Sequence, residues 1–181
     1  MSLPQDNSPL VAFDPLPASD LNNMRTNIGA LSDGTGLEDG AVTADKLALG
    51  AQTASESSSG TTTSSSFTAT LGGSPGTNPS VAVNVTTGTV MVIITAQTFS
   101  SINGAGVAVG VDISGANTEA ADLVTSLRHT GSGDVRPMTM SKVRYITGLS
   151  NGSTTFTLQY RQVGGGTATI SSRELTVIPL G

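Results

Sequence analysis

The sequence predicts a mainly β protein, in which an antiparallel β-sandwich of about eight strands, similar to a jelly roll, follows an extended N-terminal arm with one short helix. Alternation is the first observation: from Phe67 onward apolar and polar residues alternate, with turn residues every eight to twelve positions. Composition is the second, because the chain has 22 Gly and 8 Pro among 181 residues and only 12% charged residues. Such a mixture suits sheets joined by many turns better than helical bundles.

The N-terminal arm is expected to span residues 1–52. Four prolines in residues 1–18 keep that stretch extended, because Pro removes a backbone donor and disfavours helix at the residue before it. A short helix is predicted from Ser19 or Asp20, either of which can cap its first amides. Its apolar residues follow at spacings of three, four and three, and they are Leu21, Met24, Ile28 and Leu31. Three turns are too few for a coiled coil by themselves, so this stripe either lies on a surface or joins other chains.

A ten-residue repeat closes the arm, since "GAVTA" at 40–44 returns as "GAQTA" at 50–54. A segment with one or two apolar residues in ten cannot bury a core alone. We therefore expect three chains to wind together here and to bury Val42, Leu47 and Leu49 around a common axis. Residues 53–66 follow, of which eleven of fourteen are Ser or Thr, a composition typical of a linker or an extended stalk.

The sandwich is expected over residues 67–181. The candidate strands are 67–71, 81–86, 89–98, 107–113, 122–130, 140–147, 154–163 and 168–180. Gly164 to Gly166 are expected to turn a hairpin between the last two strands, with Tyr160 opposite Ile170. The apolar positions later switch to Leu175 and Val177, which predicts a bulge or bend between Ser171 and Glu174.

Charge distinguishes the arm from the sandwich. Residues 1–50 hold seven acidic residues against Arg25 and Lys46, whereas residues 67–181 hold five acidic and six basic ones. An acidic arm either meets a basic partner surface or stays solvated. No cationic stripe interleaved with aromatics is present, so nucleic-acid binding is not expected.

Membrane insertion and thiol chemistry are not expected either. The longest apolar run, Val90 to Ile94, is far too short to cross a bilayer, and the first residues lack a signal-peptide pattern. We therefore expect a product made in the cytoplasm. The chain has no Cys, which excludes disulfides, thiolate metal sites and a thiol nucleophile.

Enzymatic candidates are few. His129 is the only histidine, and Ser132 and Asp134 lie near it in a Gly-rich turn, but such adjacency does not place an imidazole between a nucleophile and a carboxylate. A pair of carboxylates for glycoside cleavage would be drawn from the acidic residues of the sandwich, which are Asp112, Glu119, Asp122, Asp134 and Glu174. We expect a protein that is not an enzyme and holds no cofactor, metal or catalytic residue.

Two binding patterns remain open. The stretch "DISGANTEAAD" gathers Asp112, Asn117, Glu119 and Asp122, which either ligate calcium or simply form polar turns. The arginines at 128, 136 and 144 recur every eight residues through one expected hairpin, where they either form a patch for an acidic polymer or protect a strand edge. The chain has no Trp and two Tyr, which disfavours a strong sugar site.

Two stretches resemble a known class of protein. "LNNMRTNIGALSDGTGLEDGAVTADKLALG", at 21–50, resembles the N-terminal part of many tailed-bacteriophage virion proteins, in which a short helix precedes phrases that wind chains into a trimeric neck. "GLSNGSTTFTLQYRQVGGGTATISSRELTVIPL", at 148–180, resembles the closing strands of sandwich domains in phage tail, head-fibre and decoration proteins. The neck repeat is short for a fibre that reaches a host.

The resemblance implies a homotrimeric, structural virion protein. Its arm would bind other virion proteins, either of the capsid or of the tail and neck, and its sandwich would be displayed on the particle. The short neck and few aromatics favour a head-fibre or decoration protein. The alternative is a short tail fibre that binds host surface polysaccharide.

The arm's helix gives a first testable prediction. Burying each of its apolar side chains against partner chains is worth roughly 1.5 to 3 kcal/mol, so losing two of them rivals the marginal stability of a domain. The double variant Met24→Asp with Ile28→Asp is expected to abolish incorporation into particles, measured by quantifying the protein in purified virions. Normal incorporation would refute the helix as the anchor.

Overall fold

The structure is a computed structural model that describes residues 50–130 and 136–180. Every regular element in that part of the chain is a β-strand, and no helix there is long and apolar enough to cross a membrane. The expected short helix and neck, with all seven proposed contact residues from Leu21 to Leu49, lie outside the described residues. The strands are β1 (Gln52–Glu56), β2 (Gly60–Thr62), β3 (Gly72–Gly73), β4 (Ser80–Val85), β5 (Thr89–Ser100), β6 (Gly106–Gly115), β7 (Leu127–Thr130), β8 (Met138–Thr147), β9 (Gly152–Val163) and β10 (Ala168–Pro179).

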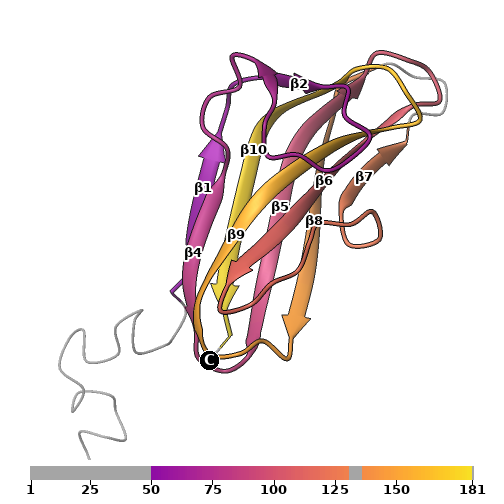
Figure 1. The fold of residues 1–181 in the computed structure, drawn as a ribbon. Helices are drawn as coiled ribbons and strands as arrows, with labels where there is room; N and C mark the ends of the chain where they lie inside the picture. Colours follow the sequence, from indigo (N-terminus) through magenta and orange to yellow (C-terminus); the bar gives the residue numbers. More distant parts are fainter. Residues whose placement is uncertain (1–49, 131–135, 181) are drawn as a thin grey trace, which may run out of the picture. The chain divides into compact units, whose positions relative to one another are not determined.

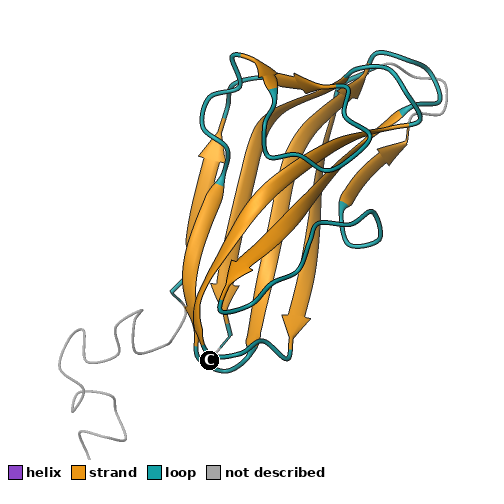
Figure 2. Cartoon of the chain, in the orientation of Figure 1, coloured by secondary structure: helices purple, strands orange, loops and turns teal. Residues whose placement is uncertain are grey.

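The strands form two antiparallel sheets packed face to face (Figures 1 and 2). Sheet A has the order β3-β2-β10-β5-β8, and β1 also pairs with β10. Sheet B has the order β4-β9-β6-β7. The predicted fold class, a mainly β antiparallel sandwich, is confirmed.

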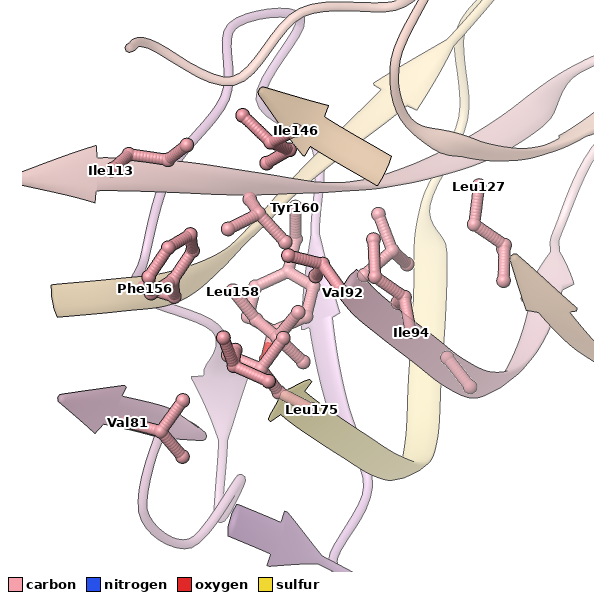
Figure 3. Packing of buried hydrophobic residues seen from close by; sticks show 14 of the residues in the cluster. Val81, Val92, Ile94, Ile113, Leu127, Ile146, Phe156, Leu158, Tyr160 and Leu175 are labelled. Atoms are coloured by element: carbon pink, nitrogen blue, oxygen red, sulfur yellow. The ribbon is translucent and has the colours of Figure 1, made fainter. Parts of the chain in front are cut away.

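The core lies between the sheets because each long strand alternates. Along β5, the side chains of Val90, Val92, Ile94 and Ala96 are buried while the residues between them are half-buried on the outer face. Aliphatic side chains from sheet A meet Phe156, Leu158 and Tyr160 of β9, and Figure 3 shows this cluster. A period of two with one buried face is what alternating sequence predicts.

Strand β6 is buried on both faces. Its inward residues from Val107 to Ile113 join the core, and its outward residues Ala108 and Gly110 are covered by the chain itself. A Cβ added at Gly110 would lie 3.0 Å from the ring of Phe67 and 3.0 Å from the Cβ of Ala121. Glycine here allows the two covering segments to approach the sheet closely.

Strand β10 changes neighbours halfway along its length. Residues 173–177 pair with β1, residues 168–170 pair with β2, and β5 runs along the other side throughout. The register against β5 shifts between Ser171 and Glu174, so the predicted bulge is confirmed. Ser172 has a φ of 46°, which a residue with a side chain adopts at a cost.

The predicted hairpin of the last two strands is wrong. Gly164, Gly165 and Gly166 do have positive φ, but β9 belongs to sheet B and β10 to sheet A, so the glycine loop crosses between sheets. Tyr160 and Ile170 both enter the core, from opposite sheets. Tyr160 and Ile170 would face the core both in a hairpin and in a connection between the two sheets. The alternation of apolar residues therefore does not distinguish the two arrangements.

Residues 53–66, predicted to be a linker, carry most of β1 and all of β2. A segment rich in Ser and Thr can form these strands because its backbone pairs with β10, while Ala54 and Thr62 face inward. Conversely, the expected strand 67–71 makes only one bridge, Thr68 to Tyr160. The segment 63–79 instead covers the edge of β9, with bonds from Gln162 N to Ser64 O and Leu158 N to Pro79 O.

The first and last described residues lie at the same end of the sandwich. Gln52 pairs with Val177, and the amide of Leu180 donates to the carbonyl of Thr89 at 3.0 Å. We name this the proximal end, which also holds the β4–β5 and β8–β9 turns (Figure 1). The opposite, distal end holds the β1–β2, β5–β6 and β9–β10 connections.

The bulge predicts an unusual response to glycine. Ser172→Gly is expected to stabilise the protein by about 0.5 to 1 kcal/mol, because removing the left-handed strain outweighs the added backbone entropy of glycine. The measurement is urea unfolding of the full chain. Ser153→Gly, in β9 where φ is not positive, serves as the matched control and should destabilise by about 0.5 to 1 kcal/mol. Equal losses in both variants would contradict the strain.

Candidate functional site

The distal end is organised by one buried cation. Arg173 is only 1% exposed, and its guanidinium donates to the carbonyl of Ser58 at 3.3 Å and to that of Pro75. It also lies 5.6 Å from the centre of the Tyr160 ring. The Nε of Arg173 has no hydrogen-bond partner within the described residues. One side chain thus connects the β1–β2 turn, the β3–β4 loop and the core.

Glu56 holds the same two loops through its carboxylate. It faces Arg173 across the β1–β10 pair, and it accepts from the amides of Ser58 at 2.8 Å and Thr77 at 2.9 Å. Hydrogen bonds from the Ser58 backbone and hydroxyl, then from Thr77, lower the pKa of Glu56 from 4.5 to about 2. The carboxylate is therefore charged throughout the neutral and mildly acidic range.

Tyr160 completes this arrangement from sheet B. Its hydroxyl donates to Oδ1 of Asn78 at 2.6 Å, and Nδ2 of Asn78 donates to the carbonyl of Leu158 at 2.9 Å. Burial raises the pKa of Tyr160 to about 12, so the phenol stays protonated and keeps its donor. These bonds fix the β3–β4 loop against β9.

A hydroxyl-lined hollow of about 440 Å³ lies along the segment that covers β9. Two of its hydroxyls brace the backbone, because Thr62 Oγ1 accepts from the amide of Ser64 and Thr68 Oγ1 from that of Thr70, each at 3.1 Å. Its lining is polar and uncharged, and consists of Thr61, Thr62, Thr63, Ser64, Thr68, Thr70 and Gly72. Such a hollow offers hydrogen bonds without a charged or aromatic contact.

His129 lies in a structural position. It is 7% exposed on β7, and its Nδ1 is 3.4 Å from the hydroxyl of Thr98 on β5. Ser132 and Asp134 lie outside the described residues. The imidazole thus links the two sheets at the side where β7 and β8 face each other.

The residues of the candidate calcium stretch are engaged separately. Asn117 donates to the carbonyl of Ser150 and the hydroxyl of Thr154, and Asp122 accepts from the amides of Val124 and Thr125. The Thr125 amide, ahead of that of Val124, lowers the pKa of the Asp122 carboxyl. Within residues 50–130 and 136–180, no three His, Asp or Glu side chains gather to hold a metal ion.

The remaining charged candidates are also apart. Asp112 on β6 and Glu174 on β10 belong to different sheets and face outward on opposite sides, and Glu119 forms an ion pair with Arg144 at 2.6 Å. The expected hairpin with three arginines is wrong, because Arg128 on β7 and Arg144 on β8 belong to different sheets.

Two cations of β8 point toward the interior and bind the β6–β7 connection. Lys142 donates to the carbonyls of Val124 at 3.2 Å and Ser126 at 2.9 Å, while Arg144 pairs with Glu119. The connection thereby closes the side of the sandwich between β6 and β8. Neither contact was visible in the sequence, because the partners lie 16 to 25 residues away along an irregular loop.

An apolar surface on sheet A was missed by sequence reasoning. Val143 is 51% and Tyr145 66% exposed on β8, and they neighbour half-buried side chains of β5 and β10. We name this the outer A surface, defined by Met91, Ile93, Val143, Tyr145 and Ile178. Its signal was the run "TVMVII" in β5, where apolar residues occupy both faces of the strand.

The carboxylate of Glu56 predicts a specific acid sensitivity. Its lowered pKa contributes stability that is present above about pH 4.5 and is lost as the pH falls toward 2. Glu56→Gln should therefore lower the Tm at pH 7, and the difference from the wild type should shrink as the pH drops through this window. Thermal unfolding followed by circular dichroism across that range measures it.

The matched control is Glu174→Gln. Glu174 lies opposite Ser55, beside the Glu56–Arg173 pair, and its carboxylate makes no hydrogen bond within the described residues. It should leave the acid-dependent part of the profile in place. A Glu56→Gln protein with the same dependence of Tm on pH as the wild type would contradict the assignment.

No protein-family model and no curated protein matches the chain. Solved structures that match the chain include one of the infectious bursal disease virus Gx strain, at 9% identity and a TM-score of 0.42 over 73% of this chain and 33% of that one. TmCBM61 in complex with β-1,4-galactotriose matches at 18% identity and a TM-score of 0.30, over 54% of this chain and 60% of its own. Eiger TNF from S. frugiperda matches at 11% identity and a TM-score of 0.35, over 70% of this chain and 94% of its own. The chain thus spans less than two thirds of the first two, and the likeness concerns the β-sandwich fold alone.

Proposed function

We propose that this chain is a non-enzymatic structural component of a tailed-phage particle, in which the arm attaches and the sandwich is displayed. Residues 1–52 bind other virion proteins of the capsid, or of the tail and neck, and associate with two further copies of the chain. The sandwich then stands on the particle surface, and the protein resides in the virion after synthesis in the host cytoplasm.

The observation that carries this proposal is the placement of the chain ends. Gly50 and Leu180 both lie at the proximal end, so the chain enters the sandwich at the end opposite the distal loops. Among them, the β1–β2 turn is bound by Glu56 and Arg173, which also bind the β3–β4 loop, so this turn keeps its shape when exposed. A fixed end and a braced free end suit a displayed module.

Attachment to the head is favoured over the tail. The neck repeat is only two copies long, which holds a sandwich close to its anchoring surface. The acidic arm, with seven acids against two bases in residues 1–50, suits a basic site on a neighbouring virion protein.

The second candidate is a short tail fibre that binds host surface polysaccharide. The hydroxyl-lined hollow of about 440 Å³ favours it, because hydroxyl groups can exchange hydrogen bonds with those of a glycan. The hollow contains no aromatic platform, which is the usual means of holding a sugar ring.

Imaging of virions tests the location. A small tag inserted at the glycine loop 164–166, at the distal end, should be labelled on intact particles, and the label should decorate the head surface. Label on the tail would support the tail-fibre alternative. If particles contain the untagged chain but not the tagged one, the result would count against the loop as a displayed site. If particles contain neither chain, the virion assignment would be overturned.

A further inference from the structure

The outer A surface is a continuous apolar patch made by neighbouring strands. Met91 of β5 pairs with Tyr145 of β8 on one side and with Ile178 of β10 on the other. One row along, Ile93 pairs with Val143. Directly opposed side chains lie about 4.5–5.5 Å apart, so these five residues touch across three strands.

The two sheets differ in how their outer faces are covered. On sheet B, Phe67 and Ala121 lie over Gly110, and the guanidinium of Arg161 lies 5.6 Å from the Phe67 ring. On sheet A, Tyr145 remains 66% exposed and Val143 51% exposed. The described chain thus covers the outer face of sheet B around Gly110 and leaves Val143 and Tyr145 on sheet A exposed.

Charge narrows what can cover the outer A surface. Among the outward residues of β1, β5, β8 and β10, Glu174 is the sole charged one, and the others are apolar, Ser, Thr or Gln. A basic partner would find one complementary charge here, and an acidic partner would find none. The five residues that define the outer A surface carry no charge, so the equivalent surfaces of other copies neither attract nor repel it through charge.

The area available for such a contact is that of the whole outer face of sheet A, of which the outer A surface is the apolar part. The four strands contain 5, 12, 10 and 12 residues, and at a rise of about 3.3 Å and a spacing of about 4.8 Å they present roughly 600 Å². Each copy can therefore bury up to roughly 600 Å² of this face against the other two, which reaches the lower limit per partner of specific protein interfaces.

Tethering compensates for the modest area. The 49 residues before Gly50 join the sandwich through Gln52, which pairs with Val177 directly beside Ile178. Copies held together by the arm therefore bring their outer A surfaces into proximity at a high effective concentration. This step rests on the homotrimer of the proposed function.

We propose that the outer A surface is the contact between the sandwiches of neighbouring copies of this chain. Met91, Ile93, Val143, Tyr145 and Ile178 of each copy face the common axis of the trimer and pack against the equivalent residues of the other two copies. The distal loops and the hydroxyl-lined hollow stay outside this contact.

The experiment compares two valine substitutions in the full chain. Val143→Glu places a carboxylate within the surface, whereas Val124→Glu makes the same change on the β6–β7 connection, at a side chain that is 88% exposed. Both variants should keep the circular dichroism of the wild type, because neither side chain is in the core. Sedimentation velocity over a dilution series gives the state of association.

Tyrosine reactivity gives a readout specific to the surface. The chain has two tyrosines, and Tyr160 is buried in the core, so nitration by tetranitromethane reports on Tyr145 and is mapped by mass spectrometry. We expect Tyr145 to be protected in the associated protein and reactive after dilution. Val143→Glu should raise the concentration needed for this protection by at least about tenfold, and Val124→Glu should leave it unchanged.

Three results would overturn the proposal. An associated protein in which Tyr145 is as reactive as after dilution would place the contact elsewhere and leave the arm as the site of assembly. A monomer with Tyr145 reactive throughout would overturn both this contact and the homotrimer. A monomer with Tyr145 protected would show that the chain covers its own surface. None of these bears on the imaging of virions, so a failure of the virion assignment stays distinguishable.

Discussion

The bulge in β10 is the constraint on which the rest of the sandwich depends. Because β10 is central in sheet A, it must pair with β5 over its full length while its other neighbour changes from β1 to β2. The extra residues at Ser171–Glu174 absorb that change, and they leave Arg173 pointing inward beneath the turn that joins the two neighbours. A single irregularity thus sets the register of the sheet and supplies the buried cation that binds the β1–β2 turn and the β3–β4 loop. Regular pairing along β10 would remove both.

Alternation made much of this fold predictable. Six of the expected segments match β4, β5, β6, β8, β9 and β10, and the change of inward positions from Ile170 to Leu175 was sufficient to locate the bulge. Partners were less predictable, because β9 and β10 are adjacent in sequence yet lie in different sheets. Residues 53–66 escaped prediction for another reason: β1 and β2 are stabilised mainly by backbone bonds to β10, which any residue except proline can make.

The candidate surfaces were predicted less well than the fold. Glu56 and Arg173 are 117 residues apart in the chain, and it is the pairing of β1 with β10 that brings them together. The apolar outer A surface was present in the sequence as an excess of aliphatic residues in β5, but a run that is apolar on both faces reads equally as a strand buried between layers. The anchor residues from Leu21 to Leu49 lie outside the described residues and stay a prediction.

The inward-pointing cations of β8 limit how neighbouring molecules on a crowded surface can associate. Strand β8 ends sheet A, and a long terminal strand offers free backbone groups to which another chain can add. Lys142 and Arg144 point inward from this strand and are bound by the β6–β7 connection, so extending the sheet into a second molecule would bring charges toward an apolar layer. Polymerisation from strand to strand is thereby disfavoured. Many copies can then be concentrated on one particle without growing into a fibril, and any contact between them has to be made by side chains.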